Sequence, residues 1–381
     1  MRKIVLFSNI FPFYSKAFWT LLIKRIDNLK IGIQFEDNRG IKLVDITKTF
    51  SKQHQRKFFK IKNILLKNKH LIYQFGVIPR AIFWEIDKAV FLGDAKVIST
   101  WIASIILRIR GIEVIFWTHG FYGKENYIKL FIRRLFYSLS NKFIVYERRG
   151  KELMISHGFK SNKIYVIFNS LDYDLNNKIF KKLLLKNNNS TSLNFKDPSK
   201  PIVCFIGRLT PQKKLDLLIK AINIINKDDY RINLLIIGEG YEKEKLKNLA
   251  FEGLEKNQVF FCGEVYDNSY AGQLLFDSSL CVSPGNVGLT AIHSLSFGTP
   301  VLTHNNYDNQ MPEVQAIVEG INGGFFNEND LNDLVKKIKY FTLSNNKISK
   351  EKCRGVIEDF YNPDYMFQTF GRLVNNENPL L

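Results

Sequence analysis

The stretch Ser283-Pro-Gly-Asn-Val-Gly-Leu-Thr-Ala-Ile-His-Ser-Leu-Ser-Phe-Gly-Thr-Pro-Val301 decides the fold of the second half of the chain. It follows a short apolar run, Leu280–Val282, that fits a buried strand, and its prolines and glycines turn the backbone sharply. Apolar residues then recur at helical spacing until Gly298, and Pro300 opens the next strand. The stretch therefore predicts a strand, a glycine-rich turn and a helix whose N-terminus attracts anions.

Strands alternate with helices on both sides of this stretch. In the first half, strands such as Ile4–Phe7 alternate with helices such as Ser99–Arg110, and a second series begins at Ile202. This alternation predicts an α/β protein with doubly wound parallel sheets, whose ligands bind at the carboxyl ends of the strands. The same patterns predict a strand at Ile41–Val44 and a helix at Lys57–Lys67.

The run 175–200 is polar and rich in turn-forming residues, around a short amphipathic helix at Ile179–Leu185. Such composition is typical of an inter-domain linker. We therefore expect domains at 1–174 and 201–360, followed by a C-terminal helix in 361–381 that returns to the N-terminal domain.

Charge is divided unevenly between the two halves. Residues 1–200 hold 37 Lys and Arg against 14 Asp and Glu, whereas the remaining residues hold 18 against 22. A basic half favours an anionic partner, which could be nucleic acid, a membrane surface or a phosphate-bearing substrate, although the charge could also serve solubility alone. No nucleic-acid recognition motif accompanies it, so we expect no nucleic-acid partner.

The four cysteines lack metal-ligand spacing, which favours reduced thiols and a reducing compartment. No apolar run is long enough to span a membrane. The chain start has no long apolar region or cleavage site, so we interpret it as a first strand and not as a signal peptide. These features predict a cytoplasmic protein.

Two basic residues follow the predicted strand Ile202–Ile206. Arg208 and Lys213 lie between this strand and its helix, with four residues between them. A guanidinium fork and an ammonium at one sheet edge suit a diphosphate. The spacing alone is equally compatible with two solvated loop charges.

Several segments together resemble the donor-binding half of group 1 (family 4) retaining glycosyltransferases, and they are listed here in chain order: Gly207-Arg-Leu-Thr-Pro-Gln-Lys213, Gly238-Glu-Gly240, Gly263-Glu-Val265, Gly288-Leu-x3-His293-x4-Gly298-Thr-Pro-Val301, Pro312-Glu-Val314 and Glu319-Gly-Ile-Asn-Gly323. More loosely, Asn169-Ser-Leu-Asp172 and Trp117-Thr-His-Gly120 are similar to segments of the same family. The resemblance implies a GT-B fold, in which two Rossmann-like domains face across a cleft. The N-terminal domain binds the acceptor, and the C-terminal domain binds the nucleotide sugar.

The resemblance also implies roles for particular residues. Arg208 and Lys213 would hold the diphosphate, and His119 the transferred sugar, which makes these three the catalytic candidates. The donor-binding candidates are Gly207, Arg208, Lys213, Glu239, Val265, Gly285, Asn286, Val287, Gly288, Leu289 and His293. No metal and no cofactor are expected, because the nucleotide sugar is a substrate and basic side chains do the work that a divalent ion does elsewhere.

The chain departs from the family at the usual Glu-x7-Glu signature. Gly285 and His293 stand where the two glutamates are expected. A neutral histidine can still bond a ribose hydroxyl, because its ring offers one donor and one acceptor. The departure leaves two interpretations open: an altered donor pocket, or a site without activity.

The loop after the first strand also departs, since many relatives have a Gly-Gly pair there. Here Phe13 and Tyr14 could stack on a sugar ring or a lipid, and Lys16 could meet a phosphate, which makes them candidate acceptor-binding residues. The aromatic residues could equally pack the loop itself.

These observations predict a retaining glycosyltransferase that moves a sugar from a nucleoside-diphospho sugar to an acceptor hydroxyl, in surface polysaccharide or glycolipid assembly. The alternatives are a silent sugar-nucleotide-binding protein and a GT-B-fold sugar-nucleotide epimerase. Expected partners are the donor, a glycan or lipid-linked acceptor, and an anionic membrane surface that the basic N-terminal domain meets at the inner face of the cell membrane. The basic segment Lys52–Lys69, with Phe58 and Phe59, is the expected contact.

Overall fold

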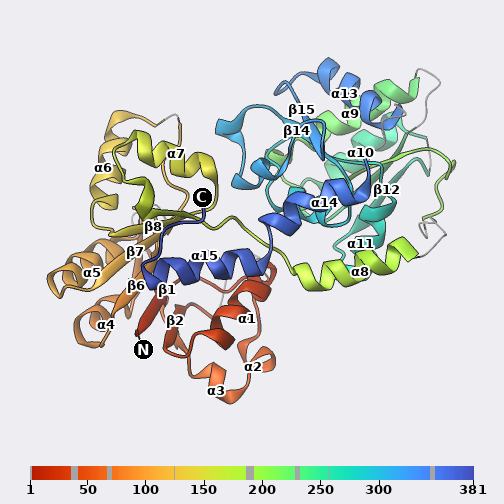
Figure 1. The fold of residues 1–381 in the computed structure, drawn as a ribbon. Helices are drawn as coiled ribbons and strands as arrows, with labels where there is room; N and C mark the ends of the chain where they lie inside the picture. Colours follow the sequence, from red (N-terminus) through yellow and green to blue (C-terminus); the bar gives the residue numbers. More distant parts are fainter. Residues whose placement is uncertain are drawn as a thin grey trace. The chain divides into compact units, whose positions relative to one another are not determined.

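The chain folds into two compact units, each with its own parallel sheet (Figure 1). Unit 1 comprises Met1–Asp172 and Asn362–Leu381, and unit 2 comprises Tyr173–Tyr361. The computed structural model describes residues 2–35, 42–66, 71–123, 125–185, 193–227, 232–255, 257–343 and 348–381.

Unit 1 is built on a seven-stranded parallel sheet in the order β3-β2-β1-β6-β7-β8-β9. The order reverses direction between the neighbours β1 and β6, so a topological switch point lies there. The strands are β1 (Ile4–Phe7), β2 (Leu29–Ile33), β3 (Phe58–Lys60), β6 (Lys88–Leu92), β7 (Glu113–Thr118), β8 (Lys142–Val145) and β9 (Ile164–Val166). The helices are α1 (Lys16–Arg25), α2 (Ile46–Thr49), α3 (Lys52–Gln55), α4 (Val77–Phe83), α5 (Ile98–Ile109), α6 (Tyr127–Tyr137), α7 (Arg148–Ser156) and α15 (Pro363–Asn375).

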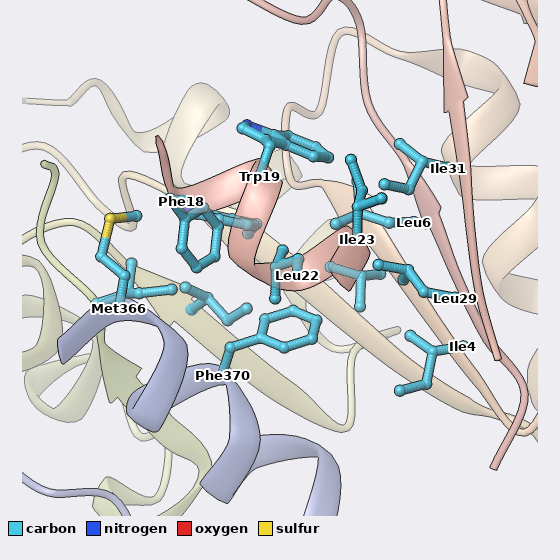
Figure 2. Packing of buried hydrophobic residues seen from close by; sticks show 14 of the residues in the cluster. Ile4, Leu6, Phe18, Trp19, Leu22, Ile23, Leu29, Ile31, Met366 and Phe370 are labelled. Atoms are coloured by element: carbon cyan, nitrogen blue, oxygen red, sulfur yellow. The ribbon is translucent and has the colours of Figure 1, made fainter. Parts of the chain in front are cut away.

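One face of this sheet is covered by two helices from opposite ends of the chain. Because successive strand residues point to opposite faces, Ile4 and Leu6 share one face of β1. Figure 2 shows Leu22 of α1 and Phe370 of α15 gathered with them in one apolar cluster. The C-terminal helix is therefore part of the unit 1 core.

The opposite face carries an aromatic core. Phe7 stacks on Phe91 at 4.8 Å between ring centroids, and Phe116 stacks on Phe136 of α6 at 4.4 Å. Figure 1 shows α4, α5 and α6 on the side of the sheet away from α1 and α15. The alternation of apolar residues along each strand thus gives each face its own helical layer.

Two expectations for unit 1 are wrong. The predicted helix Lys57–Lys67 is instead β3 followed by β4 (Lys62–Leu66), which pairs antiparallel with β5 (Leu71–Phe75). Gly32 of β2 leaves room for the Phe59 ring, since a Cβ on it would lie 2.5 Å from that ring, so pairing with β2 overrides the helical spacing. The predicted strand Ile41–Val44 is only a single bridge between Leu43 and Pro12, and Ile41 lies outside the described residues.

Unit 2 has a six-stranded parallel sheet in the order β12-β11-β10-β13-β14-β15, with its switch point between β10 and β13. The strands are β10 (Ile202–Ile206), β11 (Asn233–Ile237), β12 (Val259–Gly263), β13 (Leu280–Ser283), β14 (Val301–His304) and β15 (Gly323–Phe326). The helices are α8 (Tyr173–Leu185), α9 (Leu215–Lys227), α10 (Lys243–Gly253), α11 (Asn268–Asp277), α12 (Leu289–Ser296), α13 (Leu331–Leu343) and α14 (Lys350–Asp359). The two parallel sheets confirm the expected α/β class with doubly wound, Rossmann-like units.

The run 175–200, expected as a linker, begins within α8, which packs on α11 through Phe180 and Phe276 at 5.8 Å between ring centroids. Residues 186–192 of this run lie outside the described residues. Among the helices that the structure describes, none is long and apolar enough to cross a membrane.

The position of α15 predicts a large contribution of one residue to the stability of unit 1. Phe370 is fully buried in the cluster of Figure 2. We expect Phe370→Ala to lower the free energy of unfolding by about 3–5 kcal/mol, measured by denaturant titration, because the substitution leaves a cavity. The matched control is Gln368→Ala on the exposed side of α15, expected within about 0.5 kcal/mol of wild type. Equal stability of the two variants would contradict the core position of α15.

Candidate functional site

The predicted donor residues of unit 2 gather at its topological switch point. Arg208 and Lys213 follow β10, and Gly285–Gly288 follow the neighbouring strand β13. Because both strands are parallel, their carboxyl ends meet at one edge of the sheet. The structure therefore brings together the cations and the glycine-rich turn that the sequence singled out.

Close backbone packing joins the loops after β10 and β11. Gly238 has a φ of +140°, and a Cβ on it would lie 1.9 Å from the carbonyl oxygen of Gly207. The N–H of Leu209 donates to the carbonyl of Glu239 at 2.8 Å. The glycines at these strand ends thus allow one loop to lie directly on the other.

The turn after β13 is held against the loop after β10 in the same way. A Cβ on Gly285 would lie 1.8 Å from the carbonyl oxygen of Gln212. The Gly285 N–H donates to the Lys213 carbonyl at 3.0 Å, and the Asn286 N–H donates to the Gln212 carbonyl at 3.3 Å. A Cβ at position 285 would overlap the Gln212 carbonyl in this conformation, so the position requires glycine.

Lys213 is directed at the turn. Its Nζ donates to the carbonyl of Asn286 at 2.6 Å, and a Cβ on Gly288 would lie 3.8 Å from the same Nζ. Burial lowers the pKa of Lys213 to about 8, the nearby carboxyl of Glu313 opposes this decrease, and the charge of Arg208 adds to it. The ammonium is therefore a desolvated cation beside the glycine-rich turn.

Arg208 is exposed and makes no hydrogen bond or ion pair with any residue that the structure describes. Its charge is close enough to Lys213 to disfavour protonation there. Two like charges held near each other repel, so an anion between them relieves the repulsion. The arrangement suits a diphosphate chemically.

Helix α12 exposes only one side. Six of its residues are buried, while Leu289 and His293, one turn apart, are partly exposed. Burial lowers the pKa of His293 to about 4, so its ring is neutral at pH 7. No described residue hydrogen-bonds this ring, and its nitrogens are available to a ligand.

Gln310, which the sequence analysis did not single out, holds the turn after β13 by hydrogen bonds. Gln310 accepts from the N–H of Val287 at 2.8 Å, and its amide donates to the hydroxyl of Thr303 at 2.9 Å. The same Thr303 hydroxyl lies 2.8 Å from the Ser283 carbonyl. No local pattern marks Gln310, because its partners lie on two other segments.

The remaining donor candidates lie at the ends of β11 and β12. Glu239 forms an ion pair with Lys243, and a Cβ on Gly263 would lie 2.9 Å from a Glu239 carboxylate oxygen. Val265 is partly buried in the segment that follows β12. These residues lie near the switch point, and within the described parts of the chain no hydrogen bond or ion pair joins them to Lys213 or His293.

The unit 1 candidates lie at strand ends of their own sheet. His119 follows β7, its ring lies 4.8 Å from that of Tyr146, and burial is the main cause that lowers its pKa. Phe13 is 43% exposed, with the ammonium of Lys42 at 4.8 Å and that of Lys16 at 5.8 Å from its ring centroid. Tyr14 beside it is 47% exposed. Both rings near β1 are thus about half exposed, and their role in acceptor binding stays a prediction.

Metal ligands do not cluster in the part of the chain that the structure describes: no group of three or more His, Cys, Asp or Glu side chains there could hold an ion. The expectation of a donor site that works without a metal stays a prediction.

Comparison with known families agrees with this geometry. Residues 187–358 match the family model described as glycosyl transferases group 1. The matched residues include β10 to β15, and with them Arg208, Lys213 and the turn at Gly285.

Individual relatives extend the comparison to longer parts of the chain. The chain is 26% identical over 230 residues to an uncharacterized 41.2 kDa protein in the cps region of Klebsiella pneumoniae, covering 60% of this chain but only 59% of that protein. It is 26% identical over 284 residues to an uncharacterized glycosyltransferase of Haemophilus influenzae, covering 72% of this chain and 73% of that protein. The solved structure of HepE from Anabaena in complex with UDP is 16% identical, with a TM-score of 0.70 over 98% of this chain and 100% of that one.

The HepE likeness confirms the expected GT-B fold. The family model and the Haemophilus relative agree with the expected enzyme class, the glycosyltransferases. The retaining course of the reaction, the donor and the roles of individual residues stay predictions.

The packing at position 285 predicts the effect of adding a side chain there. We expect Gly285→Glu and Gly285→Ala to lower the free energy of unfolding alike, on the order of 1–3 kcal/mol, because the added Cβ meets the Gln212 carbonyl in both. Denaturant titration of each variant measures this. The control is Gly355→Ala in α14, where nothing lies within 4 Å of an added Cβ. Wild-type stability of Gly285→Ala would contradict the proposed packing.

Proposed function

We propose that the protein is a retaining glycosyltransferase that moves a sugar from a nucleoside-diphospho sugar to an acceptor hydroxyl. The observation that carries the proposal is the pair of cations, Arg208 and Lys213, held beside the glycine-rich turn at the switch point of unit 2. Ligands of open parallel sheets bind at this point. The UDP in the HepE complex supports a nucleoside diphosphate as the donor's leaving group.

Each part of the donor then has residues suited to it. Arg208 and Lys213 bind the diphosphate, and the backbone of Gly285–Gly288 lies against the phosphate or the sugar. His293 bonds the ribose hydroxyls with a neutral ring, in place of the usual carboxylate. Leu289, on the same exposed side of α12, supplies apolar contact, and Glu239 and Val265 flank the nucleotide.

In the proposed reaction, the bond between the anomeric carbon and the diphosphate oxygen breaks, and a bond from the acceptor oxygen forms on the same face. The acceptor proton passes to the leaving diphosphate oxygen. The protein contributes orientation and stabilisation of the negative charge that develops on the diphosphate, chiefly through Lys213 and Arg208. His119 binds the transferred sugar.

The replacement of both signature glutamates leaves a second candidate, a protein that binds sugar nucleotides without turnover. The described geometry favours transfer, because the Gly285 position is built into the packing of the loops and His293 keeps free hydrogen-bonding nitrogens. An altered donor pocket is the interpretation that we propose.

The acceptor that we propose is a glycan or a lipid-linked sugar at the inner face of the cell membrane. The relative in the cps region of Klebsiella pneumoniae supports a role in surface polysaccharide assembly. Phe13, Tyr14 and Lys16 offer aromatic faces and a cation to such an acceptor. The excess of Lys and Arg in residues 1–200 favours anionic lipid head groups.

Turnover of a nucleotide-sugar panel, with and without lipid-linked acceptors, tests the proposal. We expect acceptor-dependent release of nucleoside diphosphate, reduced about 10²–10³-fold in Arg208→Ala and Lys213→Ala because each removes charge stabilisation. Lys220→Ala on α9, whose lysine pairs with Asp216 at 3.2 Å, is the matched control and should retain the wild-type rate.

Three results would point elsewhere. Donor binding without turnover would favour the silent binder. Conversion of the sugar without acceptor would favour an epimerase. Wild-type rates in both Arg208→Ala and Lys213→Ala would exclude these residues from the diphosphate site.

The lowered pKa of Lys213 predicts a pH-dependent affinity for nucleoside diphosphates. The ammonium is charged below about pH 8 and loses its proton above it. We therefore expect the affinity for UDP to fall above about pH 8, by up to about tenfold per pH unit. Calorimetric titration across pH measures this. Lys213→Met keeps the length of the side chain without the charge, so the inflection should vanish; an unchanged inflection would assign it to another group.

A further inference from the structure

The outer side of α6 is apolar although it faces solvent. Five large side chains of this helix are between 44% and 91% exposed: Tyr127, Ile128, Phe131, Ile132 and Leu135. They recur at helical spacing on one side, while Phe136 and Tyr137 on the other side are fully buried. Contiguous apolar surface of this kind marks an interaction site.

The apolar surface continues onto the neighbouring helices. Trp101 of α5 lies 4.9 Å from Phe136 of α6, and Arg110 after α5 donates to the Trp84 carbonyl after α4 at 2.9 Å. The three helices therefore form one layer on the same side of the unit 1 sheet (Figure 1). Ile109 of α5 and Phe83 of α4 are 82% and 79% exposed. We name the exposed surface of α4, α5 and α6 the apolar face.

The charged side chains on these three helices are all basic. The helices contain Arg80, Arg108, Lys129, Arg133 and Arg134, and no Asp or Glu. Lys129 and Arg134 are exposed on α6, and neither side chain forms an ion pair with a described residue. The outer helices of unit 2 differ, since α9 and α10 carry ion pairs such as Asp216–Lys220 and Glu244–Lys247.

The exposed apolar side chains and the basic side chains together indicate which kind of partner binds the apolar face. A second copy that met the same surface would bring basic side chains against basic side chains, with no carboxylate on the three helices to pair them. A nucleic acid would leave the isoleucines and Phe131 without apolar contact. An anionic bilayer satisfies both features, because apolar side chains enter the boundary between head groups and acyl chains while Lys and Arg meet lipid phosphates.

We propose that the apolar face of unit 1 binds an anionic membrane surface. Ile128, Phe131 and Leu135 enter the interface, and Lys129 and Arg134 contact head-group phosphates. This deepens the proposed function, since it brings a lipid-linked acceptor and the protein to the same surface. The proposal also replaces the segment Lys52–Lys69 as the expected membrane contact. Residues 67–69 of that segment lie outside the described residues. The ring centroid of Phe58 lies 5.6 Å from that of Phe50, and the ring centroid of Phe59 lies 4.9 Å from that of Trp84.

Co-sedimentation with vesicles tests membrane binding of the apolar face. The assay needs no sugar donor, so a failure of membrane binding can be distinguished from a failure of the proposed transfer reaction. The full chain is mixed with vesicles of phosphatidylglycerol and phosphatidylcholine, or of phosphatidylcholine alone, at low and high salt. We expect stronger binding to the anionic vesicles. Ile128→Asp/Phe131→Asp should weaken it at least about tenfold, since it places charges in the interface. Lys129→Ala/Arg134→Ala should weaken only the salt-sensitive part.

The matched control is Phe251→Asp, which changes a 58% exposed side chain on α10 of unit 2 and should bind like wild type. Thermal unfolding and gel filtration of each variant accompany the assay. All changed side chains are exposed, so we expect unchanged unfolding temperatures. Wild-type vesicle binding by a folded Ile128→Asp/Phe131→Asp variant would overturn the proposal. So would a wild-type dimer that this variant dissociates and that binds no vesicles, since the face would then join two copies.

Discussion

A backbone contact between Gln212 and Gly285 determines the geometry of the candidate donor site. The two loops come from neighbouring strands, and each leaves the sheet at its carboxyl edge. The absence of a side chain at Gly285 lets the loops approach until the Asn286 N–H reaches the Gln212 carbonyl. This approach in turn brings the Lys213 ammonium to the Asn286 carbonyl at 2.6 Å. The position of the buried cation thus follows from a missing side chain on another segment.

The charge of Lys213 is held differently from that of Lys88, the other described lysine whose pKa burial lowers to about 8. Lys88 in unit 1 is also desolvated, but it forms an ion pair with Glu113. Lys213 forms no ion pair with a described residue, and its hydrogen bonds go to neutral carbonyls. The nearby Glu313 carboxyl offsets part of the free-energy cost of burying this charge, and a bound anion would offset more of it.

The spacing of apolar residues correctly predicted helices and strands whose buried side is determined by their own sequence. Helix α12 occupies the predicted range because its apolar spacing and the glycines around it are local signals. The prediction of a helix at Lys57–Lys67 was wrong because the conformation of this segment depends on Gly32 of another strand, which makes room for Phe59. Gln310 was missed for a related reason, since its partners Val287 and Thr303 are brought to it only by the fold. The sequence could predict which residues gather at the switch point of unit 2, but not the contacts of Gln310 that hold the turn in place.

Helix α6 shows a further limit of periodicity, because it is apolar on two sides. Apolar spacing alone does not tell that Phe136 faces the sheet while Phe131 faces solvent. Net charge likewise does not tell which basic residues serve the fold and which face a partner. The basic residues of unit 1 include Lys142, which pairs with Glu113 and serves the fold, and Lys129, which has no ion-pair partner among the described residues. A basic half therefore does not locate a partner, whereas unpaired basic residues beside exposed apolar side chains on one helical layer support the membrane contact that we propose.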